Sequence, residues 1–508
     1  MRQSVTMLGF KIEEDPHDSE VTGFAGLLPY MNLWDRLGMP KAVDDLVHIC
    51  GDQGYLDRQL VSSVFLLNLA GGDCVSDIDR LESDAGLCRM FGRAQYSGMS
   101  RVAVKAAQKR FRSGRSRTFP GATQISAFLE TCHDEAEEKK RVVGKAFIPA
   151  PNEHLSSLVK LNAYLIDQAQ RLSPTEVATL DCDATLVESQ AKSALFCYKG
   201  FSGFQPFNIF WAEQEMVLHS QFRDGNVPAG FDILRPIKEA VSMLPDSVQT
   251  VMVRQDTAGY RNDDLAWFER ANEHPRFGRI LFTISSDITP EFRQAVARVG
   301  ADEWTKEYRV RGGKQVATGR EYAEVIYMSN AQAVLTGVEE AFRFIAIREK
   351  MSDQLSLLDM EGSKAPFPVM VMGNVQYKLH AIVTNRRIEP AAELIEWHYQ
   401  RCGKSEEAHS IMKSDFAGGQ LPSGKFGANA AWWALMILSM NVHAIMKRIV
   451  LGDKWAKKRM KAVRFDLIAT PARIVHHARQ AFIRMNRQLQ KWFFDIQAAL
   501  AGLQPITV

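Results

Sequence analysis

The stretch 177–187, VATLDCDATLV, decides how the rest of the sequence is interpreted. Its first residues are apolar and β-branched, which is typical of a buried strand. Because residues two apart on a strand project to the same face, Asp181, Asp183 and Thr185 would lie side by side. Neighbouring carboxylates repel each other unless one is protonated or a cation lies between them. The stretch therefore favours a divalent-cation site with oxygen ligands, and the alternative is a strand-end pair of aspartates facing solvent.

Short β-rich runs on the C-terminal side of this stretch predict a mixed α/β sheet. With 177–187 as the first strand, the next strand runs are FNIFWA (207–212), MVLHSQFR (216–223) and TVMVRQD (250–256), all rich in β-branched and aromatic residues. Between the third and fourth strands stands FDILRPIKEAVSMLP (231–245), which has helical periodicity. Close spacing of the first three strands favours hairpin pairing among them. Three strands, a helix and a fourth strand are typical of an α/β core.

Asp256 stands directly after the buried-strand run VQTVMV and its polar Arg-Gln end. A carboxylate at the end of a central strand lies at the edge of a sheet where ligands bind. A helix N-cap or turn aspartate accounts for the same position, so Asp256 alone is a weak indication of a site.

The segment 398–413, HYQRCGKSEEAHSIMK, is the third candidate. If a helix begins near Ser405, Glu406 and Lys413 lie two turns apart on one face. A carboxylate and a cation so placed suit a site that holds a metal at one end and a phosphate at the other. An ordinary amphipathic helix with surface charges is the alternative.

Taken in this order, the motifs DATLV, RQDTAGY and WHYQRCGKSEEAHSIMK resemble those of the DDE transposases of bacterial insertion sequences. The last motif particularly resembles the insertion sequence 1380 group. There Tyr399, Arg401, Glu406 and Lys413 correspond to a Tyr-Arg-Glu-Lys signature, although Arg401 lies one place nearer Tyr399 than in the general signature. The resemblance runs from LNLAGGDCVSDIDRL to IMKRIVLG and is diffuse outside the three motifs.

The resemblance implies an RNase H-like core in which Asp183, Asp256 and Glu406 bind two Mg²⁺ ions, with Mn²⁺ as a possible substitute. Asp183 is preferred to Asp181 because the family places its first aspartate two residues before a threonine. The implied activity is cut-and-paste transposition. The ends of an insertion sequence are cleaved and transferred to target DNA by two-metal phosphoryl transfer.

The same resemblance assigns DNA contacts around the third acid. Lys413 and Arg401 would grip a phosphate or a displaced end. Tyr399 would stack on a base or bond a phosphate, and the alternative is that Tyr399 belongs to the aromatic core. The implied partners are double-stranded DNA, as terminal inverted repeats and target, and a second copy of the chain in a synaptic homodimer.

One hundred and fifty positions separate Asp256 from Glu406, and the resemblance accounts for this gap with a β-rich insertion domain. Trp304, at its start, is either a base-flipping wedge or a packed side chain. The expected division of the chain is a helical DNA-binding or dimerisation region (1–150), an RNase H-like core in two parts (171–303 and 389–450), the β-rich insertion (304–388) and a basic helical C-terminal region (451–508).

Two segments are strongly basic, although the whole chain has a net charge of only +3. Residues 443–491 hold thirteen Lys or Arg and two Asp, a local charge of +11 that predicts a DNA track with Lys457, Lys458 and Arg459 as candidates. Residues 101–117 hold seven basic residues and no acidic one, including the candidates Arg110 and Arg112. Solvated helix faces are the alternative for both segments, with the acidic cluster at 134–138 offsetting the second.

Composition sets the cellular context. With 46% hydrophobic and 24% charged residues in 508, a disordered, collagenous or disulfide-dense chain is excluded. Seven cysteines without a CxxC pair favour reduced thiols, and the charged N-terminus does not favour secretion. The most apolar run, AAWWALMILSM (430–440), is too short to span a bilayer and predicts a buried core helix. We expect a cytoplasmic, nucleoid-associated bacterial protein with no membrane partner.

Two rival functions fit part of these observations. One is a catalytically inactive, transposon-derived DNA-binding protein, which would have no reason to retain all three acids. The other is a metal-dependent nuclease that cuts DNA without strand transfer.

Overall fold

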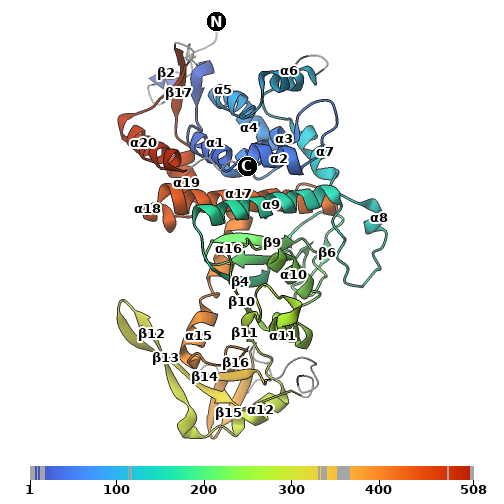
Figure 1. The fold of residues 1–508 in the computed structure, drawn as a ribbon, viewed down its shortest axis with the longest axis vertical. Coiled ribbons are helices and arrows are strands. Elements are labelled where there is room, and N and C mark those ends of the chain that lie inside the picture. Colours follow the sequence, from blue (N-terminus) through green and yellow to red (C-terminus); the bar gives the residue numbers. More distant parts are fainter. Residues whose placement is uncertain are drawn as a thin grey trace.

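The computed structural model describes residues 6–7, 10–11, 16, 18–111, 114, 117–329, 332, 340–351, 367–477 and 480–503. The molecule is elongated (Figure 1). A helical block occupies one end, a sheet lies in the middle, and further strands extend the sheet toward the other end. The predicted fold class, a mixed α/β sheet core with a β-rich insertion and a helical N-terminal region, is confirmed, and the C-terminal region is helical only in part.

The core of the sheet consists of five strands: β4 (Val177–Ala184), β8 (Phe207–Trp211), β9 (Met216–Gln221), β10 (Thr250–Gln255) and β11 (Leu281–Ser285). β4, β8 and β9 pair in antiparallel fashion, as the short links between their runs predict. β10 lies parallel to β4, and β11 lies parallel to β10. Parallel neighbours need a crossover, and α10 (Leu234–Ser242) and α11 (Asn262–Glu269) lie in these two connections.

The insertion strands extend the same sheet instead of forming a separate one. They are β12 (Thr305–Arg311), β13 (Lys314–Val325), β14 (Arg343–Lys350), β15 (Val369–Met372) and β16 (Val375–Thr384). β16 pairs antiparallel with β11, so the sheet runs in the order β12-β13-β14-β16-β11-β10-β4-β8-β9, with β15 on β16. The β12–β13 hairpin projects to the side, and α12 (Pro290–Ala297) lies near β15 (Figure 1).

Two long helices, α9 (Glu153–Leu172) and α17 (Phe426–Ile445), separate the sheet from the helical block (Figure 1). The predicted core helix is therefore confirmed as α17, in which both Trp432 and Trp433 are buried. The helical stretch Phe426–Leu451 is long and apolar enough to cross a membrane, but 72% of its most apolar window is buried inside the protein. Burial of this kind is what a core helix requires.

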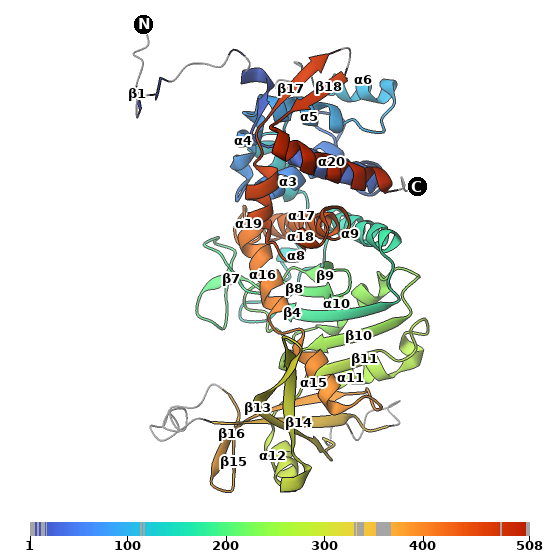
Figure 2. The same cartoon turned by 90° about the vertical axis from the view of Figure 1, so that its left-hand side faces the viewer.

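The helical block is built from the N-terminal part of the chain. Its helices are α1 (Leu27–Arg36), α2 (Met39–Leu46), α3 (Asp57–Ala70), α4 (Ile78–Glu82), α5 (Ala85–Ala94), α6 (Arg101–Lys109) and α7 (Ala122–Glu130), whereas α8 (Glu135–Glu138) lies on the sheet side of α9 (Figure 2). The block is fixed to α17 by buried polar contacts. The Tyr30 hydroxyl lies 2.8 Å from Nδ1 of His443, and the Asn68 amide donates to Ser439 at 3.2 Å.

Two helices carry the last predicted motif. α15 (Ala391–Tyr399) and α16 (Lys404–Asp415) run past the ends of the core strands toward the helical block (Figure 2). Small strands complete the middle layer: β5 (Val187–Glu188), β6 (Leu195–Phe196) and β7 (Ser202–Phe204) form a three-stranded sheet between β4 and β8 in the sequence. β1 (Thr6–Met7) and β2 (Phe10–Lys11) pair near the N-terminus.

The sequence analysis predicted a helical C-terminal region, but the structure shows that this region also contains strands. After the π-helical turn η7 (Met446–Leu451) it contains α18 (Asp453–Ala456), α19 (Met460–Val463), η8 (Arg464–Ile468), β17 (Ala472–His477), β18 (Gln480–Arg484) and α20 (Arg487–Gly502). β17 pairs with β3 (Val21–Thr22) through Ala472 and Arg473, and both Ala472 and Ile474 are buried. Because this partner strand lies some 450 positions away, the local pattern did not reveal the hairpin, and His476 and His477 belong to a strand instead of the predicted basic helix.

Candidate active site

The register of two parallel strands brings Asp183 and Asp256 together. β4 and β10 pair with Asp181 opposite Arg254 and Cys182 opposite Gln255. The next position on each chain is Asp183 and Asp256, so both aspartates lie at the carboxyl ends of neighbouring parallel strands. This is the edge of an α/β sheet where ligands bind.

Asp181 is occupied by a buried ion pair. Arg254 donates to both of its oxygens, at 2.6 and 2.8 Å, and also donates to the Trp397 carbonyl oxygen at 2.7 Å. The guanidinium also lies 4.8 Å from the centre of the Trp397 ring. Asp181 therefore fixes α15 to the sheet through Arg254, and the choice of Asp183 over Asp181 as the candidate ligand is consistent with this geometry.

Asp183 carries an energetic penalty for its charge. It accepts a hydrogen bond from the Ala184 amide at 2.9 Å, and Nη1 of Arg401 lies 3.4 Å from its Oδ2. Burial raises the pKa of Asp183 to about 6; Arg401 opposes the rise, whereas the negative charges of Asp256 and Glu406 add to it. The three acids are thus close enough to influence one another electrostatically.

Asp256 also serves as a local cap. Its Oδ1 accepts from the Ala258 amide at 3.0 Å at the start of the short turn η3 (Thr257–Gly259). The N-cap alternative is therefore correct for one oxygen of this carboxylate. A cap held through one oxygen is compatible with a metal ligand that uses the other.

Glu406 caps its own helix. It is the third residue of α16, and its Oε2 accepts a hydrogen bond from the Gly403 amide, where a φ of +85° requires a glycine-like backbone. Within the part of the chain that the structure describes, no three His, Cys, Asp or Glu side chains are close enough together to hold a metal ion. The structure brings Asp183 and Asp256 together and places Glu406 within electrostatic reach, but it does not gather all three carboxylates around one point.

The donor set nevertheless suits a hard divalent cation. Carboxylate oxygens are the ligands that Mg²⁺ prefers, and Mg²⁺ usually takes only one or two of them. The raised pKa of Asp183 reflects in part a repulsion that a cation between the acids would relieve.

The other signature residues lie on α15 and α16. Lys413 donates to the Leu186 carbonyl oxygen at 3.3 Å, which ties α16 to the segment after β4, and burial together with Lys199 lowers its pKa. Tyr399 is largely buried where α15 meets the insertion, with the guanidinium carbons of Arg309 and Arg320 at 5.4 and 5.2 Å from its ring centre. The geometry of Tyr399 is that of the core alternative, and burial raises the pKa of its hydroxyl to about 12.

Comparison with known proteins identifies the family. The family model described as transposase DDE domain, group 1, matches residues 9–505. The chain belongs to this family of DDE transposases. No curated protein matches the chain significantly. Among solved structures, the cryo-EM structure of a piggyBac transposase synaptic complex with hairpin DNA aligns with 96% of this chain and 86% of that one, at 8% identity and a TM-score of 0.37, a likeness too low to support an argument.

Several basic residues predicted to bind DNA have partners inside the transposase. Lys458 pairs with Asp466, and Nη2 of Arg459 lies 2.9 Å from the buried Asp415. Arg110 donates to the Gly54 carbonyl oxygen at 3.0 Å and to that of Gly51, so it holds a turn in place. Lys457 is exposed, and Arg112 lies outside the described residues. DNA contact by these residues stays a prediction.

Trp304 has the geometry of the packing alternative. Only 8% of it is exposed, and the guanidinium carbon of Arg348 lies 3.9 Å from its ring centre. A wedge has to reach into a duplex, whereas this ring is covered.

Sequence reasoning missed two buried side chains that support the site. Arg254 was one, although an arginine next to an apolar strand run needs a buried counter-charge. His398 was the other: it lies 3.0 Å from Thr283 Oγ1 and 3.1 Å from Ser285 Oγ, which attaches α15 to β11. Burial, with Arg401 and Arg254, lowers its pKa to about 3, so the ring is neutral.

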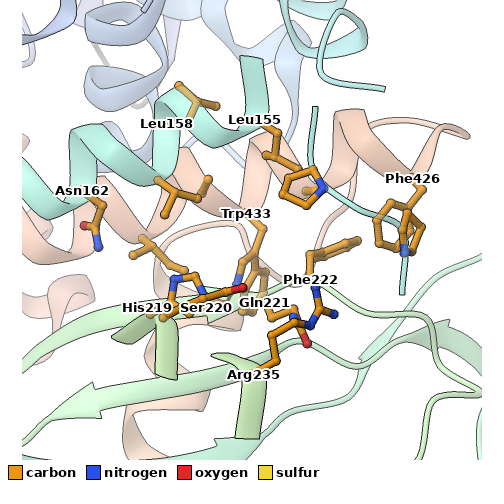
Figure 3. A pocket seen from close by; sticks show the side chains of 17 residues that line it. Leu155, Leu158, Asn162, His219, Ser220, Gln221, Phe222, Arg235, Phe426 and Trp433 are labelled. Carbon is orange, nitrogen blue, oxygen red and sulfur yellow. Dashed lines mark hydrogen bonds and ion pairs between the residues drawn. The ribbon is translucent and has the colours of Figure 1, made fainter. Parts of the chain in front are cut away.

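A separate pocket of about 100 Å³ lies between α9, α17 and β9. Figure 3 shows Leu155, Trp433 and Phe426 around it, with His219 and Ser220 from β9. Trp433 donates to Ser220 at 3.0 Å, and His219 lies 2.9 Å from Glu239. The pocket is mostly apolar and contains none of the three candidate acids, so it is not the active site.

Proposed function

We propose that this DDE transposase cuts the ends of an insertion sequence and joins them to target DNA, as a member of the insertion sequence 1380 group with an RNase H-like core. The observation that carries the proposal is the adjacency of Asp183 and Asp256 at the ends of parallel strands, while Asp181 is neutralised by Arg254. An acid with its charge opposed by burial and by two other acids is typical of a functional site.

Asp183, Asp256 and Glu406 would hold two Mg²⁺ ions, or Mn²⁺ in their place. Bound there, the ions would neutralise charge on the attacking and leaving oxygens of a phosphodiester. Only Oε2 of Glu406 accepts from the Gly403 amide, so Glu406, like Asp256, would combine a capping oxygen with a metal-binding one or release the cap to join.

Arg401 and Lys413 supply positive charge from the protein itself. Arg401 is buried beside Asp183, and a guanidinium binds a phosphate through two parallel hydrogen bonds when it is free to do so. If a bound cation balanced the charge of Asp183, Arg401 would be free to donate hydrogen bonds to a phosphate oxygen. Lys413 lies two turns beyond Glu406 on the same helix. Its ammonium group would bind a phosphate of the same DNA strand as a point charge.

The partners we propose are double-stranded DNA, as terminal inverted repeats and target, and a second copy of the chain that brings two ends together. The setting would be the bacterial cytoplasm at the nucleoid. Membership of the DDE family supports these assignments.

A second candidate is an inactive, transposon-derived DNA-binding protein. The capping position of Glu406 favours it, because the three acids do not form a ready metal site. A third, a nuclease without strand transfer, would use the same acids.

One assay separates these functions. The full-length protein is incubated with labelled end DNA, a target plasmid and Mg²⁺. Joined product supports transposition, cutting without joining indicates a nuclease, and a stable uncut complex indicates a binding protein. Asp183→Asn, Asp256→Asn and Glu406→Gln should each abolish cutting and retain DNA binding, whereas Glu396→Gln, an exposed acid on α15, should cut normally. If the three variants cut like the parent protein, the site is assigned wrongly.

A further inference from the structure

A cavity of about 380 Å³ lies between β8, α16, α17 with η7, and the segment from α18 to α19. Its lining combines buried apolar side chains, such as Phe416 and Met440, with a basic rim. Five cations line it: Lys404, Lys447, Lys457, Lys458 and Arg459. Against them stand two carboxylates, Glu215 and Glu407, so the cavity is positively charged overall.

The five cations fall into two classes. Lys458 is paired with Asp466, and Arg459 is held by Asp415, which is fully buried. Lys404, Lys447 and Lys457 form no ion pair with any residue in the described ranges. The rim therefore offers three ammonium groups whose charge is not balanced by a direct contact.

Lys404, Lys447 and Lys457 outnumber the two carboxylates, Glu215 and Glu407, that line the same cavity, so a net positive charge remains there. The field is felt by a neighbour, since Lys447 adds to the effect of burial in lowering the pKa of His443 to about 3. Binding of an anion would balance this excess positive charge, and lysine ammonium groups bind phosphates as point charges. A phosphate of DNA adds a further gain, because counter-ions are released when lysines neutralise it.

The cavity is also connected to the candidate active site through α16. Lys404 is the first residue of this helix and Glu406 is the third. Figure 2 shows α16 extending from α15 at the sheet toward α19. A DNA strand with one phosphate bound at the start of α16 could therefore continue to the candidate acids Asp183, Asp256 and Glu406.

We propose that this cavity binds a backbone phosphate of a DNA strand on Lys404, Lys447 and Lys457, and that Lys458 and Arg459 only maintain the fold. The inference rests on the proposed function, since it places the DNA strand that the carboxylates would cut. It moves the contact away from two of the residues that the charge excess alone had indicated.

The test uses the full-length protein in EDTA, so that binding is measured without cleavage. Lys404→Gln, Lys447→Gln and Lys457→Gln are made singly and together. Because the three lysines share one phosphate, the triple variant should flatten the slope of log K against log salt by about 0.9, and each single variant by less. The triple variant should bind labelled end DNA at least tenfold more weakly at about 0.15 M salt. Lys160→Gln, an exposed lysine on α9, is the matched control and should keep the parent slope.

Acetylation footprinting provides the second readout. DNA should protect Lys404, Lys447 and Lys457 and leave Lys458 unchanged. Parent-like slopes in all four variants would overturn the inference, and so would equal protection by millimolar inorganic phosphate, which would indicate a free-anion pocket. A protein that cuts DNA while its lysine variants bind normally refutes only this inference. A protein that never cuts while the lysines still govern binding refutes only the proposed function.

Discussion

Nη1 of Arg401 lies 3.4 Å from Oδ2 of Asp183, so a buried guanidinium sits beside the acid that a cation would have to join. Arg401 lowers the pKa of Asp183 against the larger effect of burial. The arginine thus acts as an internal counter-ion for Asp183. A metal bound to Asp183 and a phosphate bound to Arg401 would replace this contact with two new ones.

Loss of that counter-ion should be visible in the acid itself. Arg401→Ala should raise the pKa of Asp183 above about 6, because the opposing positive charge is gone. Arg401→Lys should have a smaller effect, since it retains a charge. Titration of the labelled Asp183 carboxyl by NMR in EDTA measures this. An unchanged pKa in Arg401→Ala would show that the contact has no electrostatic weight.

Asp183 should also make stability depend on pH. Its folded pKa of about 6 lies above the ordinary value of 3.8, so the folded protein binds the extra proton between these values. The free energy of unfolding therefore falls as pH rises from about 4 to about 7, by up to about 3 kcal/mol from this group. Asp183→Asn should lack the part of this fall that Asp183 causes. The raised pKa values of Asp224 and Asp264 cause a similar fall in both proteins, so it cancels in the difference that urea unfolding across this range measures.

Asp181 and Arg254 should behave as a structural pair. Asp181→Ala leaves a buried guanidinium without its counter-charge and should cost about 3–5 kcal/mol of folding free energy. The double variant Asp181→Leu with Arg254→Met should recover most of that loss, because no buried charge is left. Thermal and urea unfolding measure both. If Asp181→Ala keeps the parent stability and loses only cleavage, Asp181 belongs to the reacting site instead.

Much of this arrangement could be predicted from local patterns. Alternation over 177–187 placed Asp183 on a strand, and the apolar run before Asp256 placed that acid at a strand end. That the two aspartates come together was implied only by the family resemblance, and the structure supplies the reason, since β4 and β10 are parallel neighbours whose ends align. Spacing also placed Glu406 and Lys413 on one helix, where the structure has them.

The sequence could not predict contacts between residues that lie far apart in the chain. Arg459 was counted as a DNA contact because its neighbours are basic, but Asp415 from another helix neutralises it. The β17–β18 hairpin depends on β3, and no local pattern reveals a partner strand at the other end of the chain. Glu406 accepts a hydrogen bond from the Gly403 amide and does not lie against the two aspartates, and no sequence pattern predicted this contact.

Trp304 should respond to substitution as a packed side chain. Trp304→Ala removes a ring that is 8% exposed and covered by Arg348, and should cost about 3–5 kcal/mol. Trp304→Phe retains a ring for the arginine and should cost less. Unfolding and end-DNA binding are measured for both. A base-flipping role would instead leave stability intact and weaken cleavage in both variants.

Glu406 should separate capping from catalysis. Glutamine at the third helical position can still accept from the Gly403 amide, so Glu406→Gln should keep the cap and the stability of the parent. Glu406→Ala loses the cap and should cost about 1 kcal/mol. Both lack the carboxylate charge that a metal needs, so both should fail to cut end DNA with Mg²⁺. Urea unfolding and the cleavage assay, run on the same preparations, give the two readouts. Residual cutting in Glu406→Gln at the parent rate would mean that Glu406 is only a cap, and the third ligand would have to be sought elsewhere.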